Sequence, residues 1–250
     1  MRLPSIVAGV LDLLLPRHCA VSGRPLLADE PGPVSPEVLR SVEVCGADYC
    51  TRCGAPQGAG VGVISGCTAC EAYRDGFGTR EIVAVGEYGG ALRELCLALK
   101  FGGERAIARP LAAWLAPMLD ARGVLGKVEA IVPMPLHALR EFRRGYNQAA
   151  LIANELAALT GKSVWSALRR LRHTQRQALQ SAAQRKGNVD GAFAVRDAFK
   201  ARIEGKHLLL LDDVMTTGAT LGEAARTLKR AGASAIYGAI AGRATPGGDD

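Results

Sequence analysis

The apolar residues of this chain are spaced with two different periods, which predict strands alternating with helices beyond the first third of the sequence. The pattern predicts a strand over 81–88, helices over 90–101 and 105–121, a strand over 128–132 and a helix over 147–160. The run 207–211, HLLLL, contains almost no polar residue, which is typical of a strand buried on both faces of a parallel sheet. Strand, loop and helix follow one another in 128–160 and again in 207–232, so we expect an α/β fold with a mostly parallel sheet.

The first 78 residues have a different character. They hold six of the seven cysteines, and a loop rich in proline runs from Pro31 to Pro36. We therefore expect two parts: an N-terminal helix with a small cysteine-rich module over 1–78, and the α/β domain over 79–250. Residues 1–15 are interpreted as an amphipathic packing helix, because Asp12 interrupts the apolar stretch and no cleavage site for a signal peptide follows.

Composition limits the location and the class of the protein. No run approaches the roughly 18 apolar residues of a membrane span, and without an export signal we expect a cytoplasmic protein. In that compartment, paired cysteines favour metal binding over disulfides. The chain contains no GxxxxGK[ST] phosphate loop, which excludes a P-loop ATPase.

Two CxxC pairs predict a metal site. Each pair bends a short turn so that two thiolates face one point, and two such turns complete a tetrahedral zinc site. The predicted zinc ligands are Cys50, Cys53, Cys67 and Cys70. No coordination position stays open, so the zinc is expected to be structural. Cys19 and Cys45 can replace a ligand or be buried, whereas Cys96 lies on an apolar helical face and is expected in the core.

Two acids and a turn of small residues follow the apolar run of 207–211. Asp212 and Asp213 come first, and a helical pattern begins at Leu221. The turn between them consists of Thr216, Thr217, Gly218, Ala219 and Thr220. Free backbone N–H groups and hydroxyls at a helix N-terminus suit a phosphate, whereas carboxylates suit sugar hydroxyls or Mg²⁺. The alternative is a solvated turn in which a Thr or Asp only caps the helix.

Positive charge is concentrated in the stretch 137–189. The chain has a formal net charge of +7, while this stretch alone carries ten Arg or Lys residues and two Glu residues, a net +8. Such a region favours an anionic partner, and its arginines suit phosphate oxygens because guanidinium groups bind them in pairs. The candidate pyrophosphate or anion ligands are Arg140, Arg144, Arg170, Arg172, Arg176 and Arg185.

Two loops present these arginines. Residues 134–148 are predicted to form a rigid loop after a strand, because Pro133 and Pro135 lack N–H donors. Tyr146 and Asn147 in it can contact substrate or can cap and staple the next helix. Residues 166–192 are polar and weakly periodic, and we expect a long excursion over the sheet edge that covers the site. Lys100 is interpreted as a cation that complements the end of its own helix.

The segment LLLLDDVMTTGAT resembles the PRPP-binding motif of type I phosphoribosyltransferases (PRPP is 5-phosphoribosyl pyrophosphate). Together with VPMPLHALREFRRGYNQA, RRLRHTQRQALQSAAQRKGNVDGAF and the CxxC pairs, it resembles the ComF (competence protein F) family over nearly the whole chain. The resemblance implies a Rossmann-like phosphoribosyltransferase fold with a zinc-binding appendage. It also implies that Asp212 and Asp213 hold the ribose hydroxyls, and that 216–220 hold the 5-phosphate. Ser22 stands where the family pattern has a cysteine.

Two functions are consistent with these residues. The first is a phosphoribosyltransferase, a glycosyltransferase that uses PRPP and Mg²⁺ with an acceptor that the sequence does not identify. The second is a non-catalytic protein of DNA uptake or processing in natural transformation, in which the PRPP pocket is a sensor or relic. The ComF resemblance implies single-stranded DNA and a competence helicase as candidate partners.

Overall fold

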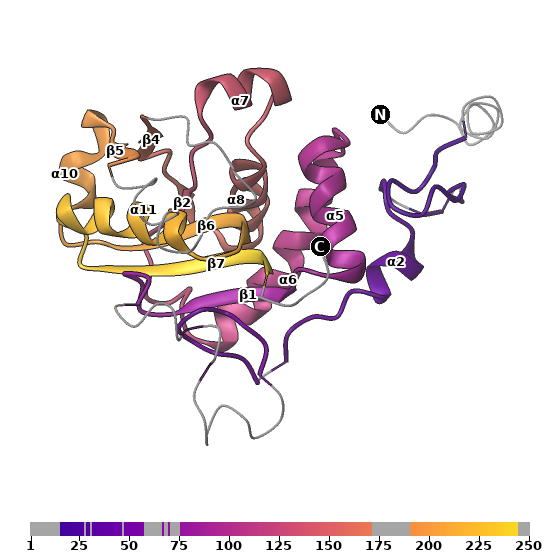
Figure 1. The fold of residues 1–250 in the computed structure, drawn as a ribbon, viewed down its shortest axis with the longest axis horizontal. Helices are drawn as coiled ribbons and strands as arrows, with labels where there is room; N and C mark the ends of the chain where they lie inside the picture. Colours follow the sequence, from indigo (N-terminus) through magenta and orange to yellow (C-terminus); the bar gives the residue numbers. More distant parts are fainter. Residues whose placement is uncertain are drawn as a thin grey trace.

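The computed structural model describes residues 16–27, 29–30, 32–46, 48–57, 67, 70, 76–171 and 191–244. Its centre is a sheet of five parallel strands in the order β1-β7-β6-β2-β3 (Figure 1). The strands are β1 (Ile82–Glu87), β2 (Ala130–Pro133), β3 (Ser163–Val164), β6 (His207–Met215) and β7 (Ala235–Arg243). The predicted α/β fold with a parallel sheet is confirmed. Leu208 to Leu211 are all 0% exposed, as expected for a strand covered on both faces.

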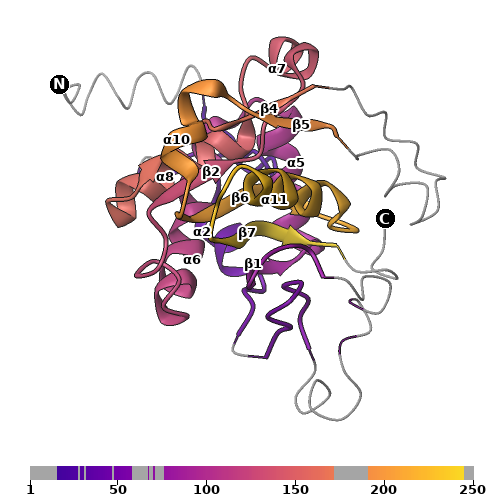
Figure 2. The same cartoon turned by 90° about the vertical axis from the view of Figure 1, so that its left-hand side faces the viewer.

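Four long helices connect these strands: α5 (Gly90–Phe101), α6 (Ala108–Ala121), α8 (Gln148–Thr160) and α11 (Ala219–Arg230). α6 and α8 pack against each other and against β1, β2 and β6, while α11 packs against β5, β6 and β7. The short elements are α2 (Pro36–Arg40), η1 (Arg105–Ile107), α7 (Ala138–Arg144), η2 (Asp197–Phe199) and α10 (Lys200–Ile203). Apart from the main sheet, β4 (Leu168–Arg170) and β5 (Phe193–Val195) form an antiparallel pair (Figure 2).

The strand order determines where a ligand can enter. The chain moves outward from β2 to the edge strand β3, returns to the centre as β6, and then moves in the opposite direction to β7. Right-handed crossovers in opposite directions place their helices on opposite faces of the sheet. The loops that follow β2 and β6 therefore start side by side at the carboxyl edge and continue to helices on opposite faces, and such a switch point is where open α/β sheets bind ligands.

The structure differs from the sequence predictions in three local features. β6 continues through Asp212 and Asp213 to Met215, because β7 pairs with it as far as Arg243. α11 begins at Ala219, two residues earlier than predicted. The predicted loop 134–148 contains the helix α7, whose sequence ALREFRR consists largely of good helix formers.

The N-terminal residues lie along the outer edge of β1, where Figure 2 shows the indigo segments beyond that strand. The Ile82 N–H donates to the Thr51 carbonyl at 2.7 Å, and the Cys45 N–H donates to the Val85 carbonyl at 2.6 Å. Buried residues of both parts belong to one hydrophobic cluster. The predicted packing helix over 1–15 lies outside the described residues. Within the described part of the chain, no helix has the length and apolar character needed to cross a membrane.

Candidate functional site

Two loops meet at the switch point between β2 and β6. The loop after β2 leads through α7 to the N-terminus of α8, and the turn after β6 leads to the N-terminus of α11. The Met134 N–H donates to the Leu211 carbonyl at 2.8 Å, which joins the start of the first loop to β6 just before the two acids. The sheet topology therefore brings the basic loop and the DD–TTGAT segment to the same edge, as predicted.

Asp213 lies in a buried polar network made by three other elements. The residue is 6% exposed, and its carboxylate accepts a hydrogen bond at 3.0 Å from Gln148 Nε2, at the first position of α8. Lys100 Nζ, from the last turn of α5, lies 3.6 Å from Asp213 Oδ2. Gln148 Oε1 in turn accepts a hydrogen bond at 2.6 Å from Arg144, on α7. Lys100 therefore faces the candidate site, in addition to its position at a helix C-terminus.

The two neighbouring acids differ in their ionisation. Burial and the charge of Asp213 raise the pKa of Asp212 well above its usual range. Burial also opposes the ionisation of Asp213, but the charge of Lys100 and the hydrogen bond from Gln148 outweigh it, so the pKa of Asp213 is lowered. The surroundings thus favour the protonated form of Asp212 and the ionised form of Asp213, as expected when two acids lie close together away from water.

The turn after β6 leaves backbone donors available. Within the part of the chain that the structure describes, the backbone N–H groups of Thr216, Thr217, Gly218 and Thr220 donate to no protein acceptor, and the Ala219 N–H reaches Thr217 Oγ1 at 3.5 Å. Gly218 adopts φ +75° and precedes the first helical residue. N–H groups pointing out of a helix N-terminus form a site for an anion such as phosphate.

Two residues that the sequence did not indicate hold this turn in place. Arg243, at the end of β7, is 1% exposed, and its guanidinium donates to the carbonyls of Met215 and Thr216. The buried ring of Phe77 lies against Gly218, where a Cβ atom would collide with it. The turn is therefore held by contacts with residues far away in the sequence.

The six candidate arginines lie in different parts of the structure. Arg144 belongs to the network of Asp213, and Arg140 lies on the same short helix α7. Arg170 lies in β4 with its guanidinium carbon 5.5 Å from the centre of the Phe193 ring. Three candidates, Arg172, Arg176 and Arg185, lie outside the described residues. The ends of the expected excursion belong to the core instead, since Ala167 and Ala192 are both 0% exposed.

Asn147 caps α8, which was one of its two predicted roles. Its Oδ1 accepts hydrogen bonds from the N–H groups of Ala149 at 3.0 Å and Ala150 at 3.3 Å, while its Nδ2 donates to the Met134 carbonyl at 2.9 Å. Tyr146 is buried and donates from its hydroxyl to the Leu99 carbonyl at 2.5 Å. Both residues connect the end of the basic loop to the core.

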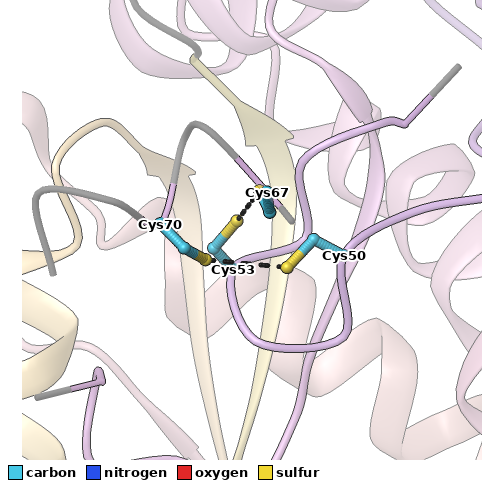
Figure 3. A group of neighbouring side chains, drawn as sticks. All are labelled: Cys50, Cys53, Cys67 and Cys70. Carbon is cyan, nitrogen blue, oxygen red and sulfur yellow. Dashed lines mark hydrogen bonds between the residues drawn. The ribbon is translucent and has the colours of Figure 1, made fainter. Parts of the chain in front are cut away.

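The four cysteines of the CxxC pairs lie together (Figure 3). Their Sγ atoms are all within 4.8 Å of one another, and the pairs Cys50–Cys70 and Cys53–Cys67 are 3.6 Å apart. Four sulfurs about 2.3 Å from a zinc ion in a tetrahedron lie about 3.8 Å apart, so this arrangement fits a Cys₄ zinc site. The first pair forms a tight turn in which the Gly54 N–H donates to the Cys50 carbonyl at 2.7 Å.

The other cysteines do not belong to this group. Cys19 is 2% exposed, and its sulfur accepts hydrogen bonds from the backbone of Ser22 and Ser35 at 3.5 and 3.3 Å. Cys45 lies beside β1. Cys96 is 2% exposed within the core on α5, as predicted.

Residues 143–245 match the family model described as "Phosphoribosyl transferase domain". The chain is 33% identical over 192 residues to competence protein F of Haemophilus influenzae, which covers 75% of this chain and 81% of that protein. It is 35% identical over 162 residues to DNA utilization protein YhgH of Escherichia coli, covering 63% and 69% of the two chains. It is 30% identical over 195 residues to competence protein ComFC of Bacillus subtilis, covering 74% and 73%.

Proposed function

Since the chain belongs to the ComF (competence protein F) family and carries a phosphoribosyl transferase domain, we propose that it binds PRPP with Mg²⁺ and transfers the phosphoribosyl group to an acceptor. The 5-phosphate would lie on the N–H groups of 216–220. Asp212 and Asp213 would hold the ribose hydroxyls, and Mg²⁺ would lie between those hydroxyls and the pyrophosphate.

The protein would promote this transfer by electrostatic stabilisation of the charges that develop. As pyrophosphate leaves C1 of the ribose, positive charge develops on the sugar, and fixed carboxylates beside it stabilise that charge. Arg140 and Arg144 on α7 would neutralise the pyrophosphate, which is supported by the start of α7 in the loop after β2. Mg²⁺ would polarise the pyrophosphate oxygens.

One observation carries the proposal. The available N–H groups after β6, the acid pair of β6 and the basic loop after β2 converge at the switch point of the sheet. A solvated turn, the bland alternative for the two acids, does not account for Asp213 being 6% exposed with a lysine and a glutamine directed at it.

Thermal unfolding with PRPP and Mg²⁺ tests the pocket. Ligand at about 100 times its dissociation constant should stabilise the protein by about 2.7 kcal/mol. The double variant Asp212→Asn, Asp213→Asn should lose this stabilisation. A wild-type protein that is not stabilised at millimolar PRPP would refute the pocket. Release of pyrophosphate with a nucleobase or an amine then separates an enzyme from a binding protein.

A second candidate function is single-strand DNA binding in DNA uptake, with the pocket as a sensor. The names of the relatives, "Competence protein F" and "DNA utilization protein", agree with such a role. Two exposed phenylalanines favour it: Phe101, at the end of α5, is 71% exposed, and Phe142, on the basic helix α7, is 88% exposed. Affinity for a single strand that does not fall as salt is raised would contradict this function.

Structural zinc at the Cys₄ group and a cytoplasmic location complete the proposal. The four thiolates suit zinc without an open position, so the ion would hold the fold. A competence helicase as partner rests on the family resemblance alone.

A further inference from the structure

Arg243, at the end of β7, is a buried cation without an acidic partner. The residue is 1% exposed, and among the described residues no carboxylate forms an ion pair with its guanidinium. Its Nε atom is buried and has no hydrogen-bond partner in that part of the chain. Arginines are rarely buried unless they are paired, because an uncompensated charge away from water is costly. The charge of Arg243 is therefore not balanced by any acid that the structure describes.

The guanidinium lies on the carbonyl side of the turn after β6. Its Nη1 atom donates to the carbonyls of Met215, at 3.1 Å, of Thr216 and of Ala244. Met215 and Arg243 are also paired in the sheet, so the side chain is held where β6 ends. A neutral amide could satisfy these carbonyls as well, so hydrogen bonding alone does not explain a positive charge at this position.

The same peptide units present N–H groups on their other side. The described chain contains no cis peptide bond, and the carbonyl and N–H of a trans peptide point in opposite directions. The units 215–216 and 216–217 therefore direct their carbonyls at Arg243 and the N–H groups of Thr216 and Thr217 away from it. Neither N–H donates to an acceptor within the described residues, and Thr216 is exposed. Both are donors of the candidate phosphate site.

A cation on the carbonyl side makes such a peptide unit a stronger donor to an anion. Hydrogen bonds that are linked in series polarise one another, and a low local dielectric constant strengthens the effect. The charge also attracts an anion directly, without contact. A phosphate on the N–H side would in turn compensate the buried guanidinium, so each charge would stabilise the other.

We propose that Arg243 supplies the positive charge of the 5-phosphate site, acting through the peptide units 215–216 and 216–217, and that the bound phosphate is its counter-ion. Arg243 is then a positioning residue, because it contacts the turn and not the ligand. The inference rests on the proposed function of this site. It also assigns the form of the ligand that the turn selects, a phosphate monoester as the dianion.

Phosphorus-31 NMR of PRPP bound with Mg²⁺ tests the charge, because the 5-phosphate gives a signal of its own. A phosphate monoester loses its second proton at about pH 6. A nearby cation favours the dianion, so the pKa of the bound 5-phosphate should lie below that of free PRPP. Arg243→Gln keeps an amide donor but removes the charge, and should raise this pKa by about one unit. An unshifted pKa in the wild-type complex would overturn the proposal.

Affinity provides a second readout. Arg243→Gln should weaken PRPP binding about tenfold, the equivalent of one pKa unit, and should not affect the binding of pyrophosphate, which lacks the 5-phosphate. Arg243→Lys keeps both charge and donor, and should recover most of the affinity. Lys229→Gln, which removes one positive charge from the opposite end of α11, is the matched control and should bind PRPP like the wild type. Equal weakening of PRPP and pyrophosphate would assign Arg243 a purely structural role.

The proposed function and the role of Arg243 fail in different ways. A wild-type protein that binds no PRPP would refute the pocket itself. Equal binding of PRPP by the wild type and by Arg243→Gln would refute only the role of the charge. The pKa of the 5-phosphate in the wild-type complex needs no variant, so it decides the question even where Arg243→Gln does not fold.

Discussion

Asp212 and Asp213 are neighbours in one strand, yet their different surroundings shift their pKa values in opposite directions. Asp213 has Lys100 and Gln148 beside it, whereas the backbone N–H of Asp213, at 2.9 Å, is the donor that the structure gives to Asp212. Burial of two acids close together favours the protonated form of one of them. A ligand that needs both carboxylates ionised, such as ribose hydroxyls with Mg²⁺, would therefore bind against the raised pKa of Asp212.

The affinity for PRPP with Mg²⁺ should accordingly rise with pH. The pKa of Asp212 is raised, so the group is still protonated at a pH where an ordinary aspartate is ionised, and binding becomes weaker as the pH falls. Below that pKa, each pH unit should cost up to about tenfold in affinity. Calorimetry in two buffers of different ionisation enthalpy measures both the affinity and the proton released.

Asp212→Asn is the control for this pH dependence, because it leaves the titration of PRPP itself in place. The variant should bind weakly and release less proton than the wild type. Equal proton release by both proteins would show that Asp212 does not titrate on binding.

Gly218 is the residue whose backbone the turn depends on. Its φ of +75° is unfavourable for any residue with a Cβ atom, and that atom would also collide with the ring of Phe77. Gly218→Ala should lower the free energy of unfolding by about 2 to 4 kcal/mol and weaken PRPP binding. Gly205→Ala is the matched control, since φ is +71° and no atom lies within 4 Å of its Cβ position.

Gly205→Ala should lower the free energy of unfolding by about 1 kcal/mol, the cost of the unfavourable backbone conformation alone. Denaturant unfolding of both variants gives the comparison. Equal losses would mean that Phe77 does not constrain the turn.

Among the elements, the N-terminus of α8 connects the basic loop to the site. Asn147 caps the helix and holds the Met134 carbonyl, and the next residue, Gln148, contacts Asp213. The cap is therefore what directs Gln148 at the acid, because it sets where the helix begins.

Asn147→Ala should lower the free energy of unfolding by about 1 to 2 kcal/mol, since it removes the cap. Asn147→Ser keeps an oxygen for the cap and is too short to reach the Met134 carbonyl, so it should recover most of the stability. Denaturant unfolding measures this part. If PRPP affinity is lost in the alanine variant and recovered in the serine variant, the cap positions Gln148. If the affinity stays low in the serine variant as well, the hydrogen bond with the Met134 carbonyl positions Gln148.

At the scale of the whole molecule, the cysteine module covers the outer edge of the sheet. Its backbone pairs with β1 through Cys45, which precedes the Cys₄ group, and through Thr51, which lies between Cys50 and Cys53. The last residues before β1 then reach the turn after β6, because Phe77 lies against Gly218. The module therefore covers an exposed strand and supports the site, although the sequence boundary at 78 suggests a separate part.

Removal of zinc should destabilise this edge of the protein. Cys53→Ser should lose one equivalent of zinc and lower the melting temperature by at least about 10 °C, because metal binding contributes to folding. Cys45→Ser, outside the Cys₄ group, should keep the zinc content. Hydrogen exchange should become faster in β1 of the zinc-free protein. Unchanged metal content in Cys53→Ser would refute the ligand set.

Local spacing in the sequence was sufficient for several features of this protein. The two CxxC pairs span residues 50–70, and the apolar run with DD–TTGAT spans 207–220. Each group is therefore short enough for its members to lie near one another in space. Alternating strands and helices likewise predicted the parallel sheet, since the period of the apolar residues follows from the geometry of each element. Helix α7 was missed because Pro133 and Pro135 suggested a loop, whereas the helix cap, His137, comes two residues after the last proline.

Only the tertiary structure decided which distant residues complete the site. Lys100, Gln148 and Arg243 come from three different elements, and nothing in their local sequence distinguishes them from residues that serve their own helix or strand. The extent of β6 likewise depends on its partner β7, because a strand continues as long as its neighbour offers hydrogen bonds. The sequence therefore identified the candidate site residues that are contiguous along the chain. The order of the strands decided which residues from distant elements lie beside them.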